Sequence, residues 1–332
     1  MTAALERAAA VLREAEEVAI ACHVNPDADA LGAMLGLSAF LRSRGTRTVC
    51  SFPNEPFELP RFALDLAGHE DLVPPSAFPE APGVMVTCDT ASMDRLGVLA
   101  RAATRAAELI WIDHHRSNGG LGTVAVVDPT ASSTCELVYR LAREIGGSLP
   151  DAAAACLYAG IVTDTGRFQY EAVRPETLRV AADLREHDFD HAHLARVLYE
   201  DNRTAYLRVL GLALSRVQLV PEADLVWTYL TLGDLEEAGV RPHEADDLID
   251  VVRTTREADV AAVIKQQRDG RFKVSLRSRG AHDVGGVAQA FGGGGHRLAA
   301  GYTSRHGLAG TVEELVAALR GSARGLEDGR GA

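Results

Sequence analysis

A short apolar run that ends in a histidine and two aspartates constrains the fold of this chain more than any other stretch. Residues 18–22 are apolar and long enough for a buried strand, and His23, Asp27 and Asp29 follow directly. Residues 28–44 then carry apolar side chains at helical spacing. A buried strand followed by polar residues and a helix is the unit from which parallel α/β sheets are built.

The same order recurs through the first half of the chain. Further strands are expected at residues 47–52, 84–88, 109–112 and 123–127, and helices at 5–17, 61–67, 132–145 and 151–162. This alternation predicts an α/β fold with a largely parallel sheet and helices on both faces. In such sheets ligands gather beyond the carboxyl ends of the strands.

The length of 332 residues suits two domains. We expect a first domain over 1–186, a helical linker over 187–215, a smaller α/β domain over 216–322 and a flexible tail over 323–332, with the active-site cleft between the domains. In the smaller domain, strands are expected at 217–219, 225–231, 260–267 and 272–276, and a helix at 312–319.

Composition excludes several classes of protein. No apolar run approaches the roughly 18 residues of a membrane span, and the first ten residues lack the order of a signal peptide, so we expect a cytoplasmic protein. The net charge of −12 argues against binding of long duplex nucleic acid through its backbone. The five cysteines are widely spaced, which favours buried thiols over disulfides or a zinc site.

Acidic and imidazole side chains gather around the predicted strand ends. They are His23, Asp27, Asp29, Asp89, Asp113, His114, His115 and Asp164. Carboxylates with a few imidazoles suit Mn²⁺ or Mg²⁺ better than structural zinc. Two such ions about 3.5–4 Å apart would offset repulsion among the carboxylates and would activate water against a phosphate. The spacing of Asp27 and Asp29 suits neighbouring metals, and Asp89 suits a bridge between them.

Each residue also has a plainer interpretation when it is taken alone. Asp27 would cap the helix that follows it, Asp89 would belong to a turn, and Asp164 would end a loop. The joint occurrence of these residues favours the metal site. Asp113 is the weakest member, and we expect it to orient a histidine.

These motifs resemble, in order, the four motifs of the DHH phosphoesterase superfamily. The four motifs in this sequence are His23-Val24-Asn25-Pro26-Asp27-Ala28-Asp29, Asp89, Asp113-His114-His115 and Gly160-Ile161-Val162-Thr163-Asp164-Thr165-Gly166. The glycine-rich segment 292–301 is similar to that of the accessory DHHA1 domain. The combination of these two domains and the length of the chain resemble the branch of the superfamily that contains nanoRNases and pAp phosphatases. The resemblance covers residues 10 to 320 or so.

The resemblance implies two Mn²⁺ ions, with Mg²⁺ or Co²⁺ as alternatives. One ion would be held by His23, Asp27 and Asp89, and the other by Asp29, Asp89, His114 and Asp164. His115, Asp89 and Asp113 would be the catalytic residues, with His115 directed at the substrate phosphate. The implied substrates are short RNA oligonucleotides, including pApA, and 3′-phosphoadenosine 5′-phosphate (pAp). The implied assembly is a homodimer.

The accessory domain would bind the rest of the substrate. Gly293, Gly294 and Gly295 would let backbone N–H groups approach a phosphate or base, and His296 and Arg277 would add polar contacts. The alternative is that these glycines form a flexible loop.

Arg95 would approach the phosphates, or else would form a surface salt bridge. Two further functions remain open from the sequence. One is a non-catalytic nucleotide sensor, and the other is a phosphodiesterase of cyclic or linear dinucleotides.

Overall fold

The computed structural model describes residues 2–115 and 118–327, apart from the side chains of His296 and of residues 322–327. The chain forms two compact units, Met1–Asp201 and Asn202–Ala332. The segment 187–215, expected as one linker, is shared between them: α7 (His191–Tyr199) belongs to the first unit and α8 (Thr204–Ser215) to the second.

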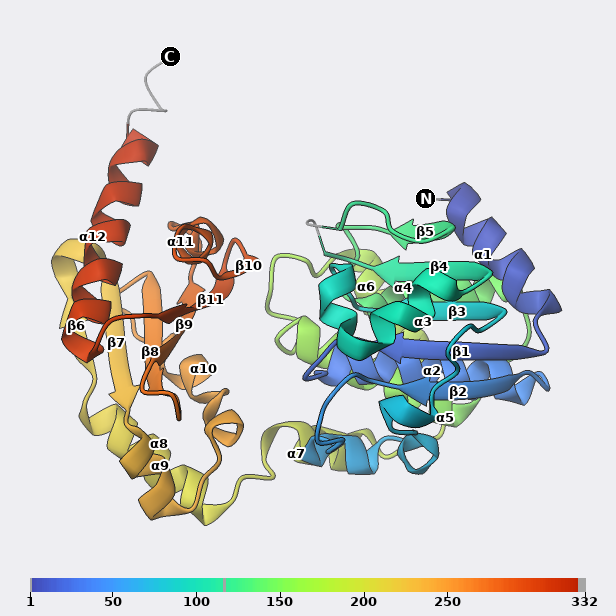
Figure 1. Cartoon of the computed structure of the whole chain (residues 1–332), viewed down its shortest axis with the longest axis horizontal. Coiled ribbons are helices and arrows are strands. Elements are labelled where there is room, and N and C mark those ends of the chain that lie inside the picture. The colour runs from blue at the N-terminus through green and yellow to red at the C-terminus, as the bar shows by residue number, and fades with distance from the viewer. Residues whose placement is uncertain (1, 116–117, 328–332) are drawn as a thin grey trace. The chain divides into compact units, whose positions relative to one another are not determined.

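The first unit is built on a five-stranded sheet with the order β2-β1-β3-β4-β5. Its strands are β1 (Glu17–Cys22), β2 (Arg47–Ser51), β3 (Val84–Cys88), β4 (Glu108–Asp113) and β5 (Val124–Val127). Every neighbouring pair is parallel, which confirms the predicted sheet type. The carboxyl ends of β1, β3 and β4 therefore lie next to one another at one edge (Figure 1).

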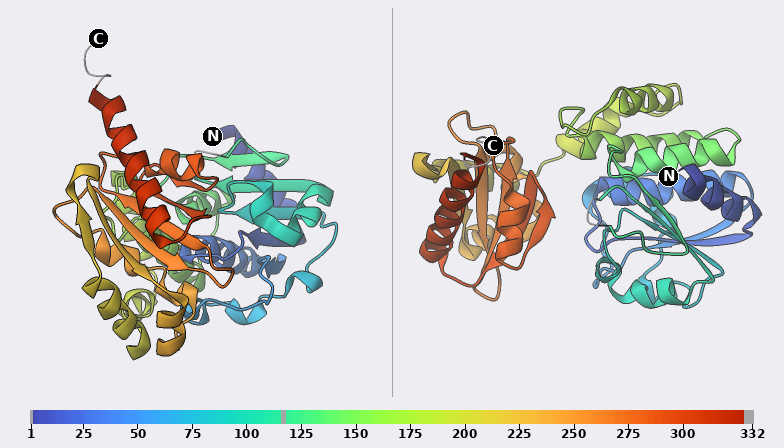
Figure 2. Two further views of the ribbon diagram at one scale, coloured as in Figure 1. Left: turned by 60° about the vertical axis from the view of Figure 1, so that its left-hand side comes forward. Right: turned by 90° about the horizontal axis from the view of Figure 1, so that it is seen from above.

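Helices cover both faces of this sheet because successive strand residues point to opposite sides. On β1, Val18 and Ile20 pack into the larger core, whereas Ala19 and Ala21 pack into a smaller one that contains Trp111. The helices are α1 (Thr2–Glu14), α2 (Ala28–Ser43), α3 (Ala100–Arg105), α4 (Thr134–Ile145), α5 (Asp151–Asp164), α6 (Pro175–Leu184) and α7. Short 3₁₀ turns are η1 (Arg61–Asp65), η2 (His69–Asp71), η3 (Pro75–Ala77) and η4 (Met93–Leu99). The right-hand view of Figure 2 shows this sheet between a blue and green layer and a teal one.

The second unit has a six-stranded sheet with the order β10-β11-β9-β8-β7-β6, in which only β7 and β8 pair in parallel. Its strands are β6 (Gln218–Val220), β7 (Leu225–Leu230), β8 (Val260–Gln266), β9 (Phe272–Ser278), β10 (Gly294–His296) and β11 (Ala299–Ser304). Its helices are α8, α9 (Leu232–Ala238), α10 (Leu248–Val252), α11 (Val284–Ala290) and α12 (Leu308–Glu327), with 3₁₀ turns η5 (Pro221–Ala223) and η6 (Pro242–Ala245).

Three elements differ from the sequence predictions. The helix expected over 61–67 is a 3₁₀ turn over Arg61–Asp65, and β10 and β11 form a hairpin in the glycine-rich segment, where no strand was predicted. The last helix extends to Glu327, so residues 323–327 are helical instead of part of a tail. Once a helix is nucleated, each added residue gains a hydrogen bond, and these bonds outweigh the low helix propensity of Gly321 and Gly325. The remaining tail, 328–332, lies outside the described residues.

Two predictions about the whole chain can be compared with the described residues. All five cysteines are buried and free, as expected. No helix within residues 2–115 and 118–327 has both the length and the apolar character needed to cross a membrane.

Candidate metal centre

The predicted site residues meet at the carboxyl edge of the first unit's sheet. His23 follows β1, Asp89 follows β3, and Asp113 is the last residue of β4, with His114 and His115 directly after it. These three strands are neighbours in the sheet, so their side chains converge.

Asp29 and Asp164 come from helices rather than directly from strand ends, and for Asp29 this agrees with the helix expected over 28–44. Asp29 lies in the first turn of α2, and Asp164 is the last residue of α5. The two helices pack closely at Gly160, where an added Cβ would lie 2.8 Å from Asp29 Oδ1 and closer still to Cys135 Sγ. The absence of a side chain at this position therefore lets α5 approach Asp29 closely.

Three groups of side chains have ligand atoms within 4.8 Å of one another. They are His23 with Asp27 and Asp89, Asp29 with His114 and Asp164, and Asp89 with His114 and His115. Asp89 lies between the other groups, since its Oδ2 is 3.4 Å from His23 Nε2 and its Oδ1 is 3.6 Å from His114 Nε2. His114 Nε2 is also 3.4 Å from Asp164 Oδ2 and 3.9 Å from Asp29 Oδ2.

Asp27 caps a helix and also lies beside His23. Its Oδ1 accepts the backbone N–H groups of Asp29 and Ala30 at 3.1 and 3.0 Å, which caps α2. Its Oδ2 lies 3.9 Å from His23 Nε2 and is available to a metal. One carboxylate thus caps the helix and also faces the site.

The ring of His23 is oriented by its backbone neighbour. Nδ1 lies 2.8 Å from Val24 O and 3.0 Å from the Arg95 guanidinium. A carbonyl only accepts, so Nδ1–H donates to Val24 O, and the Arg95 contact is a close approach of two donors. Nε2 faces the carboxylates, 3.4 Å from Asp89 Oδ2. Arg95 is exposed beside His23, and no ion pair of Arg95 with a carboxylate occurs among the described residues.

Asp89 has an unusual backbone and a well-defined environment. Its φ of 54° is left-handed, a conformation that few side chains other than Asp and Asn adopt readily. Burial by itself would raise its pKa, but the hydrogen bond to His23 and the charges of His23, His114 and His115 outweigh burial and lower the pKa below its usual range. Asp89 is therefore held as a carboxylate.

Asp29, which is buried, and Asp164, which is partly exposed, show the opposite shift. Burial together with the charge of Asp89 raises the pKa of Asp29 to about 7, and burial with the charges of Asp29 and Asp89 raises the pKa of Asp164. The carboxylates cannot all be charged at neutral pH without nearby cations. This arrangement fits a site for hard divalent cations with oxygen and imidazole ligands.

Asp113 is fully buried and all of its oxygens are engaged. Oδ1 accepts His115 Nδ1–H at 2.6 Å and the backbone N–H of His114 at 2.9 Å. Oδ2 accepts the amide of Asn118 at 2.7 Å. These bonds fix the orientation of the His115 ring, as expected for a residue that positions a histidine.

The second unit holds the remaining predicted residues. Arg277 on β9 lies across from Ala299, which pairs with His296, and its Nε is 3.9 Å from Asp250 Oδ1. Gly294 and Gly295 pair with β11, and Gly293 packs so closely that a Cβ would meet Tyr302. Gly293 and Gly295 thus have a packing role besides any ligand role. The His296 side chain lies outside the described part of the structure.

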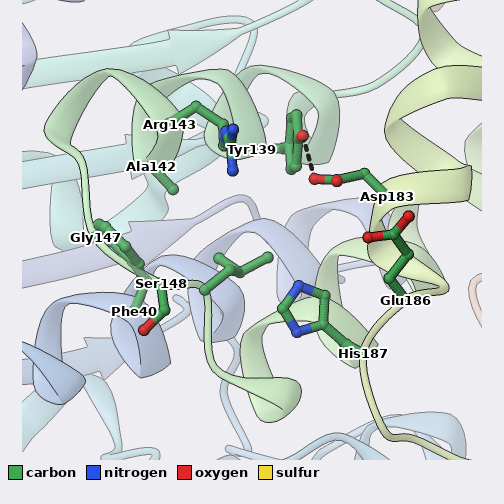
Figure 3. A pocket seen from close by; sticks show the side chains of 10 residues that line it. Phe40, Tyr139, Ala142, Arg143, Gly147, Ser148, Asp183, Glu186 and His187 are labelled. Atoms are coloured by element: carbon green, nitrogen blue, oxygen red, sulfur yellow. Dashed lines mark hydrogen bonds between the residues drawn. The ribbon is translucent and has the colours of Figure 1, made fainter.

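A separate cavity of about 240 Å³ lies between α4 and α6 (Figure 3). It is lined by Tyr139, whose hydroxyl donates to Asp183, and by Arg143, Glu186 and His187. None of the predicted metal ligands lines it, so it is not part of the candidate metal centre.

The sequence interpretation missed Thr134, which contacts both Asp29 and Asp89 from the start of α4. A signal was present: Ser133 and Glu136 have the spacing of a capping box, which places the helix start at Thr134. That signal locates the helix, but it does not indicate what the first turn contacts.

Comparisons with known proteins agree with this geometry. Two family models match the chain: the N-terminal domain of the DHH family over residues 17–161 and the DHHA1 domain over residues 224–324. The chain is 34% identical over 297 residues to the "bifunctional oligoribonuclease and PAP phosphatase NrnA" of Thermus thermophilus, which covers 89% of this chain and 86% of that protein. It is 30% identical to the Bacillus subtilis protein of the same name, over 84% and 86% of the two chains.

A solved structure shares the fold. An exopolyphosphatase-related protein from Bacteroides fragilis aligns over 98% of both chains with a TM-score of 0.91 at 24% identity. At this identity the likeness concerns the fold alone.

Proposed function

Because this chain belongs to the DHH family and is a hydrolase that acts on phosphoester bonds, we propose that it cleaves short oligoribonucleotides to mononucleotides and dephosphorylates pAp to AMP. One observation carries the proposal: the ligand groups converge at the strand edge in a chain similar to two NrnA proteins over most of its length. Linear dinucleotides such as pApA are included among the substrates.

The proposed cofactor is a pair of Mn²⁺ ions, with Mg²⁺ or Co²⁺ as alternatives. His23, Asp27 and Asp89 would hold one ion, and Asp29, Asp89, His114 and Asp164 the other. The close approach of ligand atoms around Asp89 supports this division. When bound, the ions would supply an activated water and stabilise the leaving oxygen.

The chain's own residues would bind and orient the substrate. His115, held by Asp113, would donate a hydrogen bond or a proton to the phosphate. Arg95, exposed next to His23, would attract the phosphate charge. In the DHHA1 domain, Arg277, the glycine segment 293–295 and His296 would contact the rest of the substrate.

The net charge of −12 disfavours long nucleic acid, because a long chain would add phosphates without adding attraction. A substrate panel tests the proposal. It contains pAp, pApA, RNAs of two to five nucleotides and a 24-mer, each assayed with Mn²⁺ and with chelator.

We expect rapid Mn²⁺-dependent turnover of pAp and the short RNAs, and slow turnover of the 24-mer. Asp89→Asn should abolish turnover, whereas His115→Ala should lower it about 10²–10⁴-fold, the usual contribution of one acid–base group. No hydrolysis of any substrate by the metal-loaded protein would refute the proposal and favour a nucleotide sensor. Light scattering during gel filtration tests the expected homodimer.

A further inference from the structure

The first turn of α4 contacts two of the proposed metal ligands at once. Thr134 N–H donates to Asp29 Oδ2 at 2.7 Å, and Cys135 N–H donates to Asp29 Oδ1 at 2.9 Å. The Thr134 hydroxyl donates to Asp89 Oδ1 at 3.0 Å. Asp29 and Asp89 are both 2% exposed and Thr134 is fully buried, so water does not compete for these bonds.

These contacts use a general property of helix termini. The first N–H groups of a helix have no partner within the helix, and the N-terminus carries partial positive charge. In α4 two of these N–H groups each take one oxygen of Asp29, which fixes the plane of that carboxylate. Asp29 can then turn neither toward nor away from His114.

The hydroxyl of Thr134 has the same effect on Asp89. It occupies one lone pair of Oδ1, the oxygen that lies 3.6 Å from His114 Nε2, while Oδ2 lies 3.4 Å from His23 Nε2. Rotation of the carboxylate would break the hydroxyl bond. Each oxygen of Asp89 is therefore kept facing a different group of ligands.

A buried network keeps the turn itself in place. Glu136 Oε2 accepts Ser132 N–H at 3.1 Å, Ser132 Oγ–H at 2.6 Å and Thr177 Oγ1–H at 2.9 Å. Glu136 Oε1 accepts from Arg140, and Glu136 N–H donates to Ser133 Oγ at 3.1 Å. Because Glu136 is fully buried and its bonds are satisfied, the turn is preorganised before any metal binds.

We propose that Thr134 is a positioning residue of the metal centre, whose hydroxyl sets the rotation of the Asp89 carboxylate so that it can bridge two metals. This inference rests on the proposed function, since it concerns the same metal site. Thr134 touches neither substrate nor metal in this account. Its loss should weaken metal binding and lower kcat while leaving the KM for substrate nearly unchanged at saturating metal.

Three variants separate this role from a general effect on folding. Thr134→Val keeps the shape and the backbone N–H but removes the hydroxyl, and Thr134→Ser keeps the hydroxyl. Thr228→Val is the matched control, because Thr228 is also fully buried and donates its hydroxyl to a backbone oxygen, that of Ala213, in the second unit.

The main measurement is Mn²⁺ affinity by titration calorimetry on the metal-free protein, followed by kcat and KM for pAp. We expect Thr134→Val to weaken Mn²⁺ binding by about 10–100-fold, as is usual when a partner of a metal ligand is lost. Thr134→Ser should stay within about threefold of wild type, since its hydroxyl still reaches Asp89, and Thr228→Val should match wild type.

Wild-type affinity in Thr134→Val, or equal loss in Thr134→Val and Thr134→Ser, would overturn the inference. If Thr134→Val does not fold, Thr134→Ala is judged by the same criteria, and failure of both to fold would overturn it in favour of a purely structural role. The proposed function fails in a different way, namely if the wild-type protein binds no Mn²⁺ or hydrolyses none of the substrates.

Discussion

A single methyl group added at Gly160 tests how closely α5 must approach the metal centre. The Cβ of Gly160→Ala would lie 2.8 Å from Asp29 Oδ1 and 2.9 Å from Asp29 Cα, with Cys135 Sγ nearer still. Two of the three neighbours belong to a proposed metal ligand that α4 holds in place. The substitution should therefore affect both stability and metal binding.

The magnitude follows from two opposing effects. Alanine is favoured over glycine inside a helix by about 1 kcal/mol, whereas overpacking a core costs roughly 1–3 kcal/mol. The net change at Gly160 should be a loss of about 0–2 kcal/mol in the free energy of unfolding. Gly211 on α8 has open space where its Cβ would lie, so Gly211→Ala should gain up to about 1 kcal/mol.

The two tryptophans allow each unit to be followed separately, because Trp111 lies in the first and Trp227 in the second. Urea unfolding is measured through Trp111 in a Trp227→Phe background for Gly160→Ala, and through Trp227 in a Trp111→Phe background for Gly211→Ala. Cys135→Ala removes the nearest obstacle, so in that background Gly160→Ala should cost about 1 kcal/mol less. A gain in stability from Gly160→Ala equal to that of Gly211→Ala would refute the reasoning.

Four further predictions concern charged and titratable residues. Burial and the charge of Asp89 raise the pKa of Asp29 to about 7 in the metal-free protein, so Mn²⁺ binding should release more protons at pH 6 than at pH 8, a difference measurable by calorimetry in buffers of different ionisation heat. Because the folded-state pKa of Asp29 is raised, protonated Asp29 stabilises the metal-free first unit at low pH, and this stabilisation should be lost as pH rises through about 7. A thermal stability that does not change with pH up to about 7 would contradict this. Hydrogen bonds from Arg216 lower the pKa of Asp234 to about 2. These bonds should stabilise the second unit by up to about 2 kcal/mol above pH 4 or so, and this stabilisation should disappear as pH falls toward 2. Acid titration of Asp234→Asn should not show this loss of stability. Asp113→Asn should lower kcat about 10–100-fold while Mn²⁺ stoichiometry stays unchanged; lost metal binding would instead make Asp113 a ligand.

The parallel sheet was predictable because its three central strands, β1, β3 and β4, are buried on both faces and are followed by polar residues. The strand 84–88 was predicted with the bounds that β3 has, and the helix 28–44 differs from α2 by one residue. The orienting role of Asp113 was also an expectation, and its hydrogen bonds to His115 and Asn118 agree with it. Local pattern sufficed for these features because each depends on neighbours in the chain.

Other features depend on contacts between distant segments. The hairpin of β10 and β11 was missed because four consecutive glycines are not typical of a strand, although Gly293 packs closely against Tyr302 and Gly295 against Ala300. The contact between Thr134 and Asp89 joins residues 45 positions apart, and no periodicity in the sequence indicates it. Asp27 both caps α2 and faces His23. The sequence could not indicate this combination, because either role alone explained the position of Asp27.

Metal stoichiometry tests the central claim most directly, namely that Asp89 joins two groups of ligands into one two-metal centre. Mn²⁺ bound per chain is measured by calorimetry and by the paramagnetic resonance signal of free Mn²⁺. We predict two ions in the wild-type protein, one in His23→Ala, one in Asp164→Asn and none bound tightly in Asp89→Asn, because Asp89 Oδ2 faces His23 whereas its Oδ1 faces His114. A wild-type protein that binds a single ion, or an Asp89→Asn variant that still binds two, would contradict the account.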